Sequence, residues 1–100
     1  MRIAKAIGTV VSTQKEPSLA GTKFLLVQFV DEKGELTDHY EVAADTVGAG
    51  IEEWVLVSLG SGARQIRDGE NRPIDAAVVA IIDTVTIGNQ FIYNKRLQSR

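Results

Sequence analysis

Two copies of the tripeptide Asp-Thr-Val, at Asp45–Val47 and Asp83–Val85, contain the residues whose type and spacing could support catalysis. Aspartic proteases of the retroviral kind have a similar chain length and place Asp-Thr-Gly in an exposed loop, where two carboxylates share one proton. Here valine stands in the place of that glycine, and both aspartates have strand-like neighbours. We therefore interpret each as a strand-end carboxylate that accepts hydrogen bonds, and we expect the protein not to be an enzyme.

Two glycine pairs, Gly48-Ala49-Gly50 and Gly60-Ser61-Gly62, raise the question of a nucleotide or acyl-transfer site. A dinucleotide fingerprint needs a third glycine where this chain has Glu53, and a helix where it has an apolar strand pattern. The second pair lacks the glycine spacing of a nucleophile elbow. Both pairs are better explained as tight turns or as points of close backbone approach.

Metal and cofactor sites have little support in the residue types. His39 is the single histidine, beside Asp38 and Glu41, and is typical of a solvated strand residue. The chain has no cysteine, which excludes disulfides, thiolate catalysis and cysteine-bound metals and fits a reducing compartment. We expect no metal and no cofactor.

Nucleic-acid binding is the main alternative of a different class, because aromatic residues can stack on bases in small barrels. The candidates for such stacking are Phe24, Phe29, Tyr40, Trp54, Phe91 and Tyr93. Most of them lie in apolar runs, which favours core or interface packing. The net charge of −2 and the pI near 5.3, without a basic cluster, also argue against a phosphate-binding surface.

Length and composition predict a single domain over residues 1–100, with 44% hydrophobic residues to form a modest core. The N-terminus lacks a secretory hydrophobic region. The longest apolar run, Ala76–Ile82, is far shorter than the roughly 20 residues of a membrane span. We expect a soluble, cytoplasmic protein with no membrane partner.

Strands dominate the predicted structure. Trp54–Leu59 lies between the two glycine-rich turns and is apolar on both faces, which indicates a strand buried from two sides. The other predicted strands are Ile3–Thr13, Lys23–Asp31, Tyr40–Ala44 and Ala76–Val85, with a hairpin joining the second and third. Residues 61–66 could form one helical turn. Gly88-Asn89 is expected to form a turn before the short apolar piece Phe91–Tyr93, and residues 94–100 are expected to form a polar basic tail.

Five strands without covering helices predict a small closed β-barrel, since closure removes the sheet edges. Several of these strands are apolar on both faces, whereas a small barrel has one interior. Their outer faces would expose more apolar surface than a soluble monomer tolerates. We therefore predict a homo-oligomer in which strand faces of neighbouring subunits meet.

Several ordered motifs also resemble a known family, the EutN/CcmL family of bacterial microcompartment vertex proteins. The motifs are Ala4–Thr13, Asp45–Gly50, Glu53–Val57, Gly60–Arg64, and Pro73–Asp75 leading to Ile81–Asp83. They run through nearly the whole chain, and Tyr40–Ala43, the run from Ala76 to Val85 and Tyr93–Arg96 are most similar to the carboxysome members. One departure is Gly62, where the family commonly has alanine or serine.

The resemblance implies an all-β, OB-like five-stranded barrel with at most one short helical turn and a C-terminal tail. It also implies a homopentamer that caps the vertices of a polyhedral shell, with hexameric shell proteins as partners and carbon dioxide fixation as the process served. No catalysis is required of such a unit. An OB-type nucleic-acid or ligand binder remains the alternative. The candidates for contacts between subunits or around the fivefold axis are Gly48, Ala49, Gly50, Gly60, Ser61, Gly62, Ala63, Arg64, Asp75, Tyr93, Lys95 and Arg96.

Overall fold

The computed structural model describes residues 1–60 and 74–98. Its barrel strands are β1 (Arg2–Val10), β2 (Phe24–Val30), β3 (Leu36–Asp45), β4 (Trp54–Leu59) and β5 (Ala76–Ile81). A 3-10 turn, η1 (Pro17–Leu19), lies between β1 and β2. The chain then continues into β6 (Thr84–Ile87), β7 (Gln90–Asn94) and a one-turn helix, α2 (Lys95–Gln98). The predicted all-β fold is confirmed.

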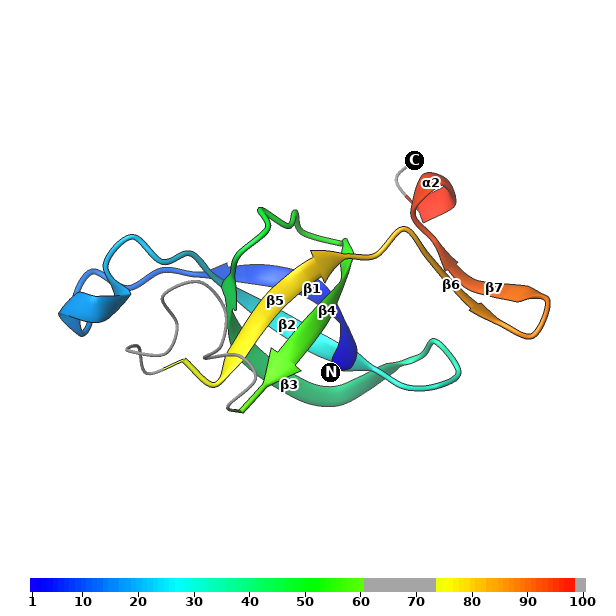
Figure 1. The fold of residues 1–100 in the computed structure, drawn as a ribbon, viewed down its shortest axis with the longest axis horizontal. Helices are drawn as coiled ribbons and strands as arrows, with labels where there is room; N and C mark the ends of the chain where they lie inside the picture. The colour runs from blue at the N-terminus through cyan, green and yellow to red at the C-terminus, as the bar shows by residue number, and fades with distance from the viewer. Residues whose placement is uncertain (61–73, 99–100) are drawn as a thin grey trace.

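The five strands close into a barrel in the order β1-β2-β3-β5-β4 (Figure 1). Neighbouring strands are antiparallel except β3 and β5, which run parallel over two residue pairs, Ala44 with Ala77 and Asp45 with Val78. The predicted hairpin of β2 and β3 is present, with Leu26 opposite Val42. The remaining strands, β6 and β7, form a separate two-stranded sheet that projects from the barrel.

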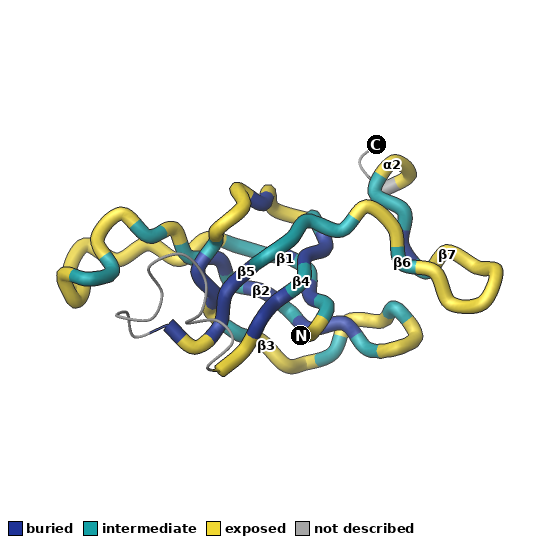
Figure 2. The backbone as a smooth tube through the Cα atoms, viewed as in Figure 1, coloured by how far each residue is buried: buried dark blue, intermediate teal, exposed yellow. Residues whose placement is uncertain are grey.

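The barrel interior contains many small side chains. Its core consists of Ala4, Ala6, Leu25, Val27, Phe29, Ala43, Ala49, Val55, Val57, Ala76 and Val78. Small residues stand opposite large ones in the strand register, as Ala4 does between Phe29 and Val55. This alternation lets facing side chains interdigitate at the density of a protein interior. The buried segments in Figure 2 follow these strands.

Several predicted boundaries differ from the structure, and the first strand ends at Val10 although it was predicted to reach Thr13. The run Ala76–Val85 was expected as one strand, but β5 ends at Ile81 and β6 begins at Thr84. The N–H of Ile82 still donates to the Trp54 carbonyl on β4 (2.8 Å), and the chain then leaves the barrel. The third strand starts at Leu36, earlier than predicted. The helical turn predicted for residues 61–66 lies outside the described residues.

Candidate functional site

The glycine-rich turn after β3 is held in place by one carboxylate. The side chain of Asp45 is fully buried and accepts hydrogen bonds from the N–H groups of Val47 (3.1 Å), Gly48 (3.0 Å) and Ala49 (3.0 Å). Lys23 adds its ammonium group at 3.5 Å from the carboxylate. A carboxylate that accepts several backbone N–H groups fixes a turn firmly. The prediction of a strand-end carboxylate that accepts hydrogen bonds is confirmed for Asp45.

A second carboxylate closes the same turn from its other end. Glu53 accepts the N–H of Gly50 at 2.6 Å and the ammonium group of Lys95 at 2.6 Å. The Lys95 hydrogen bond and then the Gly50 N–H lower the pKa of Glu53, and the Glu53 hydrogen bond raises the pKa of Lys95. Because Lys95 begins α2, this pair joins the turn to the C-terminal segment.

Backbone strain is found in the same turn. Gly48 has φ +76°. Glu52 has φ 79°, and among residues 1–60 and 74–98 it is the only residue other than glycine with a φ in the left-handed region. Such a conformation costs free energy at a residue with a Cβ, and the surrounding contacts must hold it. The Glu52 N–H donates to the Ala6 carbonyl (2.7 Å), and its carboxylate pairs with Lys5 (2.8 Å). The turn is therefore a rigid feature of the protomer.

The C-terminal segment, residues 84–98 (β6, β7 and α2), is called the arm here. Its base rests on the barrel, where the ring of Tyr93 stacks on Trp54 with centroids 4.4 Å apart and an interplanar angle of 14°. Both residues are buried in a cluster with Val30. The N–H of Lys95 also donates to the Asp83 carbonyl at 2.8 Å. The direction of the arm is thus set within the protomer.

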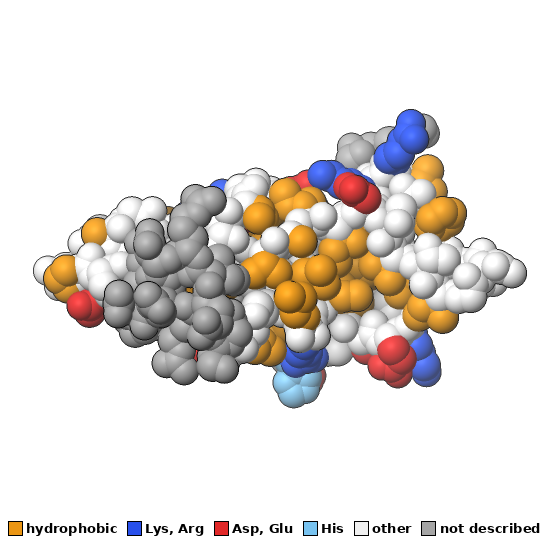
Figure 3. All heavy atoms as spheres, in the orientation of Figure 1, with side chains coloured by type: hydrophobic (Ala, Val, Ile, Leu, Met, Phe, Trp, Pro, Cys, Tyr) orange, Lys and Arg blue, Asp and Glu red, His pale blue; other side chains and the backbone are white. Residues whose placement is uncertain are grey.

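Beyond its base, the arm exposes apolar side chains. Ile87 is 53% exposed, Phe91 63% and Leu97 64%. In Figure 3, apolar side chains gather over β4 and β5 and continue towards the arm. Single exposed apolar residues are ordinary, but three on a short projecting element form a surface suited to contact with another protein.

A second apolar surface lies on the outside of β1, β2 and β3, and we call it the outer face. It consists of Val10, Phe24, Leu26, Tyr40 and Val42, which the strand register places side by side. Tyr40 is 53% exposed and Val42 43% exposed. This surface agrees with the expected surplus of apolar strand faces.

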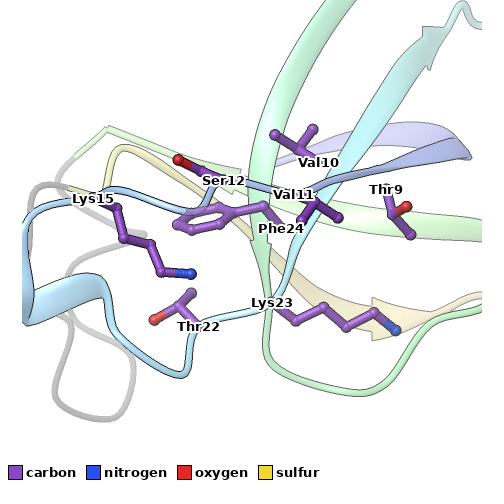
Figure 4. A pocket seen from close by; sticks show the side chains of 8 residues that line it. All are labelled: Thr9, Val10, Val11, Ser12, Lys15, Thr22, Lys23 and Phe24. Atoms are coloured by element: carbon purple, nitrogen blue, oxygen red, sulfur yellow. The ribbon is translucent and has the colours of Figure 1, made fainter.

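An open pocket of about 340 Å³ lies where β1 ends and β2 begins. Its lining consists of Thr9, Val10, Val11, Ser12, Lys15, Thr22, Lys23 and Phe24 (Figure 4). In Figure 4 the ammonium groups of Lys15 and Lys23 lie far from each other. Lys23 instead turns to Asp45 and to the Ala49 carbonyl, 3.5 Å from each. The pocket therefore lacks the converging cations that an anion site needs.

The predicted contact residues fall into three places. Gly48, Ala49 and Gly50 lie in the turn held by Asp45 and Glu53, and Tyr93, Lys95 and Arg96 lie in the arm. Gly60 and Asp75 meet through a backbone hydrogen bond of 2.7 Å, from the glycine N–H to the aspartate carbonyl. Ser61, Gly62, Ala63 and Arg64 lie outside the described residues.

Sequence reasoning missed some of the residues that organise these surfaces. Glu53 was discussed as the residue that stands where a dinucleotide fingerprint needs its third glycine. In the structure it closes the turn and binds Lys95. Phe91 was assigned to a short apolar piece, whereas it is an exposed residue of the arm. The available signal was the lack of any charge from Thr84 to Asn94, which is unusual for an exposed hairpin. The interpretation of His39 as a solvated residue is confirmed, with its side chain 73% exposed.

Among residues 1–60 and 74–98, no helix is long and apolar enough to cross a membrane. In the same residues, no group of three histidine or acidic side chains is placed to hold a metal ion. The described surface instead offers a rigid turn, an arm and an outer face, which are features for contact between proteins.

Comparison with known proteins shows which class of protein has this fold and these surfaces. The family model described as "Ethanolamine utilisation protein EutN/carboxysome" matches residues 1–83. The carboxysome shell vertex protein CcmL of Synechococcus elongatus is 65% identical over 99 residues, covering 99% of this chain and 100% of the relative.

Two solved structures are also similar. That of Gloeobacter violaceus CcmL superimposes with a TM-score of 0.92 at 57% identity, covering 96% of this chain and 99% of the other. The pentameric microcompartment shell protein GrpN of Rhodospirillum rubrum has a TM-score of 0.78 at 52% identity, covering 87% and 100%.

The closed barrel and these similarities define a structural component of a bacterial microcompartment shell, of a class that is not catalytic. The chain belongs to the EutN/CcmL family. Its function is that of a shell vertex protein, and its place is the carboxysome shell.

Proposed function

We propose that this chain assembles into a homopentamer whose sole activity is to occupy the vertices of the carboxysome shell, with hexameric shell proteins as neighbours. It performs no catalysis and binds neither nucleic acid nor membrane. The observation that carries the proposal is the pair of separate apolar surfaces, the arm and the outer face, on one rigid protomer. A closed ring needs two different, complementary patches on each subunit.

The shape requirement explains why fivefold units are needed. A flat layer of hexagonal tiles cannot close on itself, so a polyhedral shell requires units with fivefold symmetry where the layer must curve. A protomer held rigid by Asp45 and Glu53 suits that task, because a fixed angle between neighbouring subunits gives a fixed curvature. The same two carboxylates are occupied by backbone N–H groups and by lysines, which also supports a structural role.

Native mass spectrometry of the purified chain at micromolar concentration tests the assembly. The expected spectrum contains the pentamer as the main species, and a monomer or dimer would contradict the proposal. A filter-binding assay with single-stranded DNA and RNA at moderate ionic strength provides a separate test. Salt-dependent retention would favour the nucleic-acid binder, because phosphate contacts release counterions and weaken steeply with salt.

Deletion of the gene in its host tests the function itself. Compartments without vertex units are expected to be elongated or unclosed, while the enclosed enzymes keep their activity. Complementation with the wild-type gene provides the control. Closed polyhedral compartments in the deletion strain, combined with tight nucleic-acid binding by the purified protein, would overturn the proposal.

A further inference from the structure

The carboxylate of Glu53 serves two elements of the protomer at once. Its Oε1 accepts the N–H of Gly50 at 2.6 Å, and its Oε2 lies 2.6 Å from the ammonium nitrogen of Lys95. Gly50 belongs to the turn after β3, whereas Lys95 begins α2 in the arm. A carboxylate is planar, so a single orientation of the side chain makes both bonds. Because ordering a side chain costs conformational entropy, the bond that fixes this orientation makes the other bond easier to form.

The glycine at position 50 leaves room for this carboxylate. Gly50 is not among the glycines with a positive φ, so the backbone conformation does not require a glycine there. Space does, since an added Cβ would lie 3.2 Å from Oε1 of Glu53. A Cβ added at Gly48 would meet nothing within 4 Å, although its φ of +76° disfavours a side chain. Gly48 therefore shapes the turn, and Gly50 admits Glu53 to it.

The other partner of the carboxylate lies at the base of the arm. The N–H of Lys95 donates to the Asp83 carbonyl at 2.8 Å, so its backbone joins the end of β7 to the residue before β6. Its side chain reaches out of the arm to Glu53. The stack of Tyr93 on Trp54 fixes the arm to the barrel, and the Lys95 side chain adds a connection to the turn.

We propose that Glu53 couples the turn (residues 46–50) to the arm, so that loss of either bond to its carboxylate loosens the element at the other end. This inference goes beyond the proposed function, because it concerns the inside of one protomer and does not depend on the pentamer. Energetic coupling between two sites is reciprocal. A contact that stabilises the arm therefore also stabilises the turn, and a contact on the turn stabilises the base of the arm.

Replacement of Lys95 by methionine tests the coupling from the arm to the turn. The variant keeps an apolar stem and removes the ammonium group, which leaves Glu53 with one bond in place of two. Amide exchange of Gly50, measured by NMR in the assembled protein, should become about two- to fivefold faster, as expected for loss of a partly exposed charged pair. The N–H groups that Asp45 binds provide the internal comparison, and their exchange should not change; they belong to Val47, Gly48 and Ala49.

Lys5→Met is the matched control. Lys5 pairs with Glu52 at 2.8 Å, so this variant breaks the ion pair of the neighbouring carboxylate and leaves both bonds of Glu53 in place. Exchange at Gly50 and in the arm should keep the wild-type rate. An unchanged Gly50 rate in Lys95→Met, or an equal increase in Lys5→Met, would refute the coupling.

Two alanine variants test the coupling from the turn to the arm. In Gly50→Ala the new Cβ displaces the Glu53 carboxylate, so exchange of the amides of residues 84–98 should become about two- to fivefold faster relative to the barrel. Gly48→Ala makes the same chemical change in the same turn, in open space. It should leave the arm's exchange unchanged relative to the barrel. An arm loosened equally by both variants would show a general loss of stability and no coupling through Glu53.

The double variant Lys95→Met with Gly50→Ala decides whether both effects pass through the same carboxylate. The link is already broken in Lys95→Met, so adding Gly50→Ala should cause no further increase of exchange in the arm. Rate increases that multiply in the double variant would show two independent effects and would overturn the proposal. Native mass spectrometry of each variant verifies that all of them are compared in the same state of assembly.

Discussion

Replacement of Asp45 by alanine is the most direct test of the turn that follows β3. The substitution removes the acceptor of three backbone N–H groups at once. Val47 and Gly48 are exposed, so water can replace the carboxylate for their N–H groups. Ala49 is 1% exposed, and its N–H would be left without a partner inside the protein.

The size of the effect follows from this difference. A buried polar group without a partner costs about 1–3 kcal/mol, and the two charge-assisted bonds that water replaces add about 1 kcal/mol between them. We therefore expect Asp45→Ala to lower the free energy of unfolding by about 2–4 kcal/mol. In a domain of this size each 1 kcal/mol shifts Tm by about 4–8 °C, so the expected loss is at least about 8 °C.

Urea and thermal unfolding at one fixed protomer concentration measure this change, since assembly makes stability depend on concentration. Asp38→Ala is the matched control, because the Asp38 side chain is 97% exposed and lies 3.8 Å from the His39 ring. The control should stay within about 0.5 kcal/mol of the wild type. An equally small change for Asp45→Ala would refute the conclusion that this carboxylate holds the turn.

Three further predictions concern the turn and the arm. Gly48→Ala should lower the free energy of unfolding by about 1–2 kcal/mol in urea titrations, because its φ of +76° is unfavourable with a Cβ. Gly50→Ala should cost less, since its Cβ would meet only the movable carboxylate of Glu53 at 3.2 Å; equal losses would contradict this reasoning.

Tyr93→Ala should speed amide hydrogen exchange throughout the arm more than in the barrel, because the stack on the barrel is lost; uniform changes would argue against a separately anchored arm. The stabilisation from Glu53, whose pKa is lowered on folding, is present above its unfolded pKa and is lost as pH falls through the folded value. The stabilisation from Lys95, whose pKa is raised, is lost as pH rises through its folded value. Thermal unfolding of the Glu53→Gln variant at a series of pH values should show a Tm that falls less steeply in acid than the Tm of the wild type. An unchanged dependence of Tm on pH would show that the ion pair of Glu53 and Lys95 does not contribute to it.

The barrel could be predicted from local patterns because its strands carry strong ones. Trp54–Leu59 was predicted with the observed bounds, since an apolar run between two glycine pairs has sharp ends. The hairpin of β2 and β3 was also predicted from its turn composition, and Gly34 there has φ +83°. These features depend on neighbours in the sequence.

The arm could not be predicted in the same way. The run from Ala76 to Val85 is rich in β-branched residues, and its one charged residue, Asp83, is the single mark of the break between Ile81 and Thr84. The direction of the arm depends on the contact of Trp54 with Tyr93, two residues far apart in the sequence. The role of Glu53 likewise depends on Lys95, which the fold brings within 2.6 Å.

The small side chains of the barrel interior have a mechanical consequence. Alanine has no side-chain rotamers, and valine has few, so a core made mainly of these residues has little internal freedom to yield under load. Ala4, Ala6 and Ala43 are among the residues of this core. When a shell swells or is compressed, deformation should therefore concentrate at the joints between subunits, and each subunit should behave as a stiff tile.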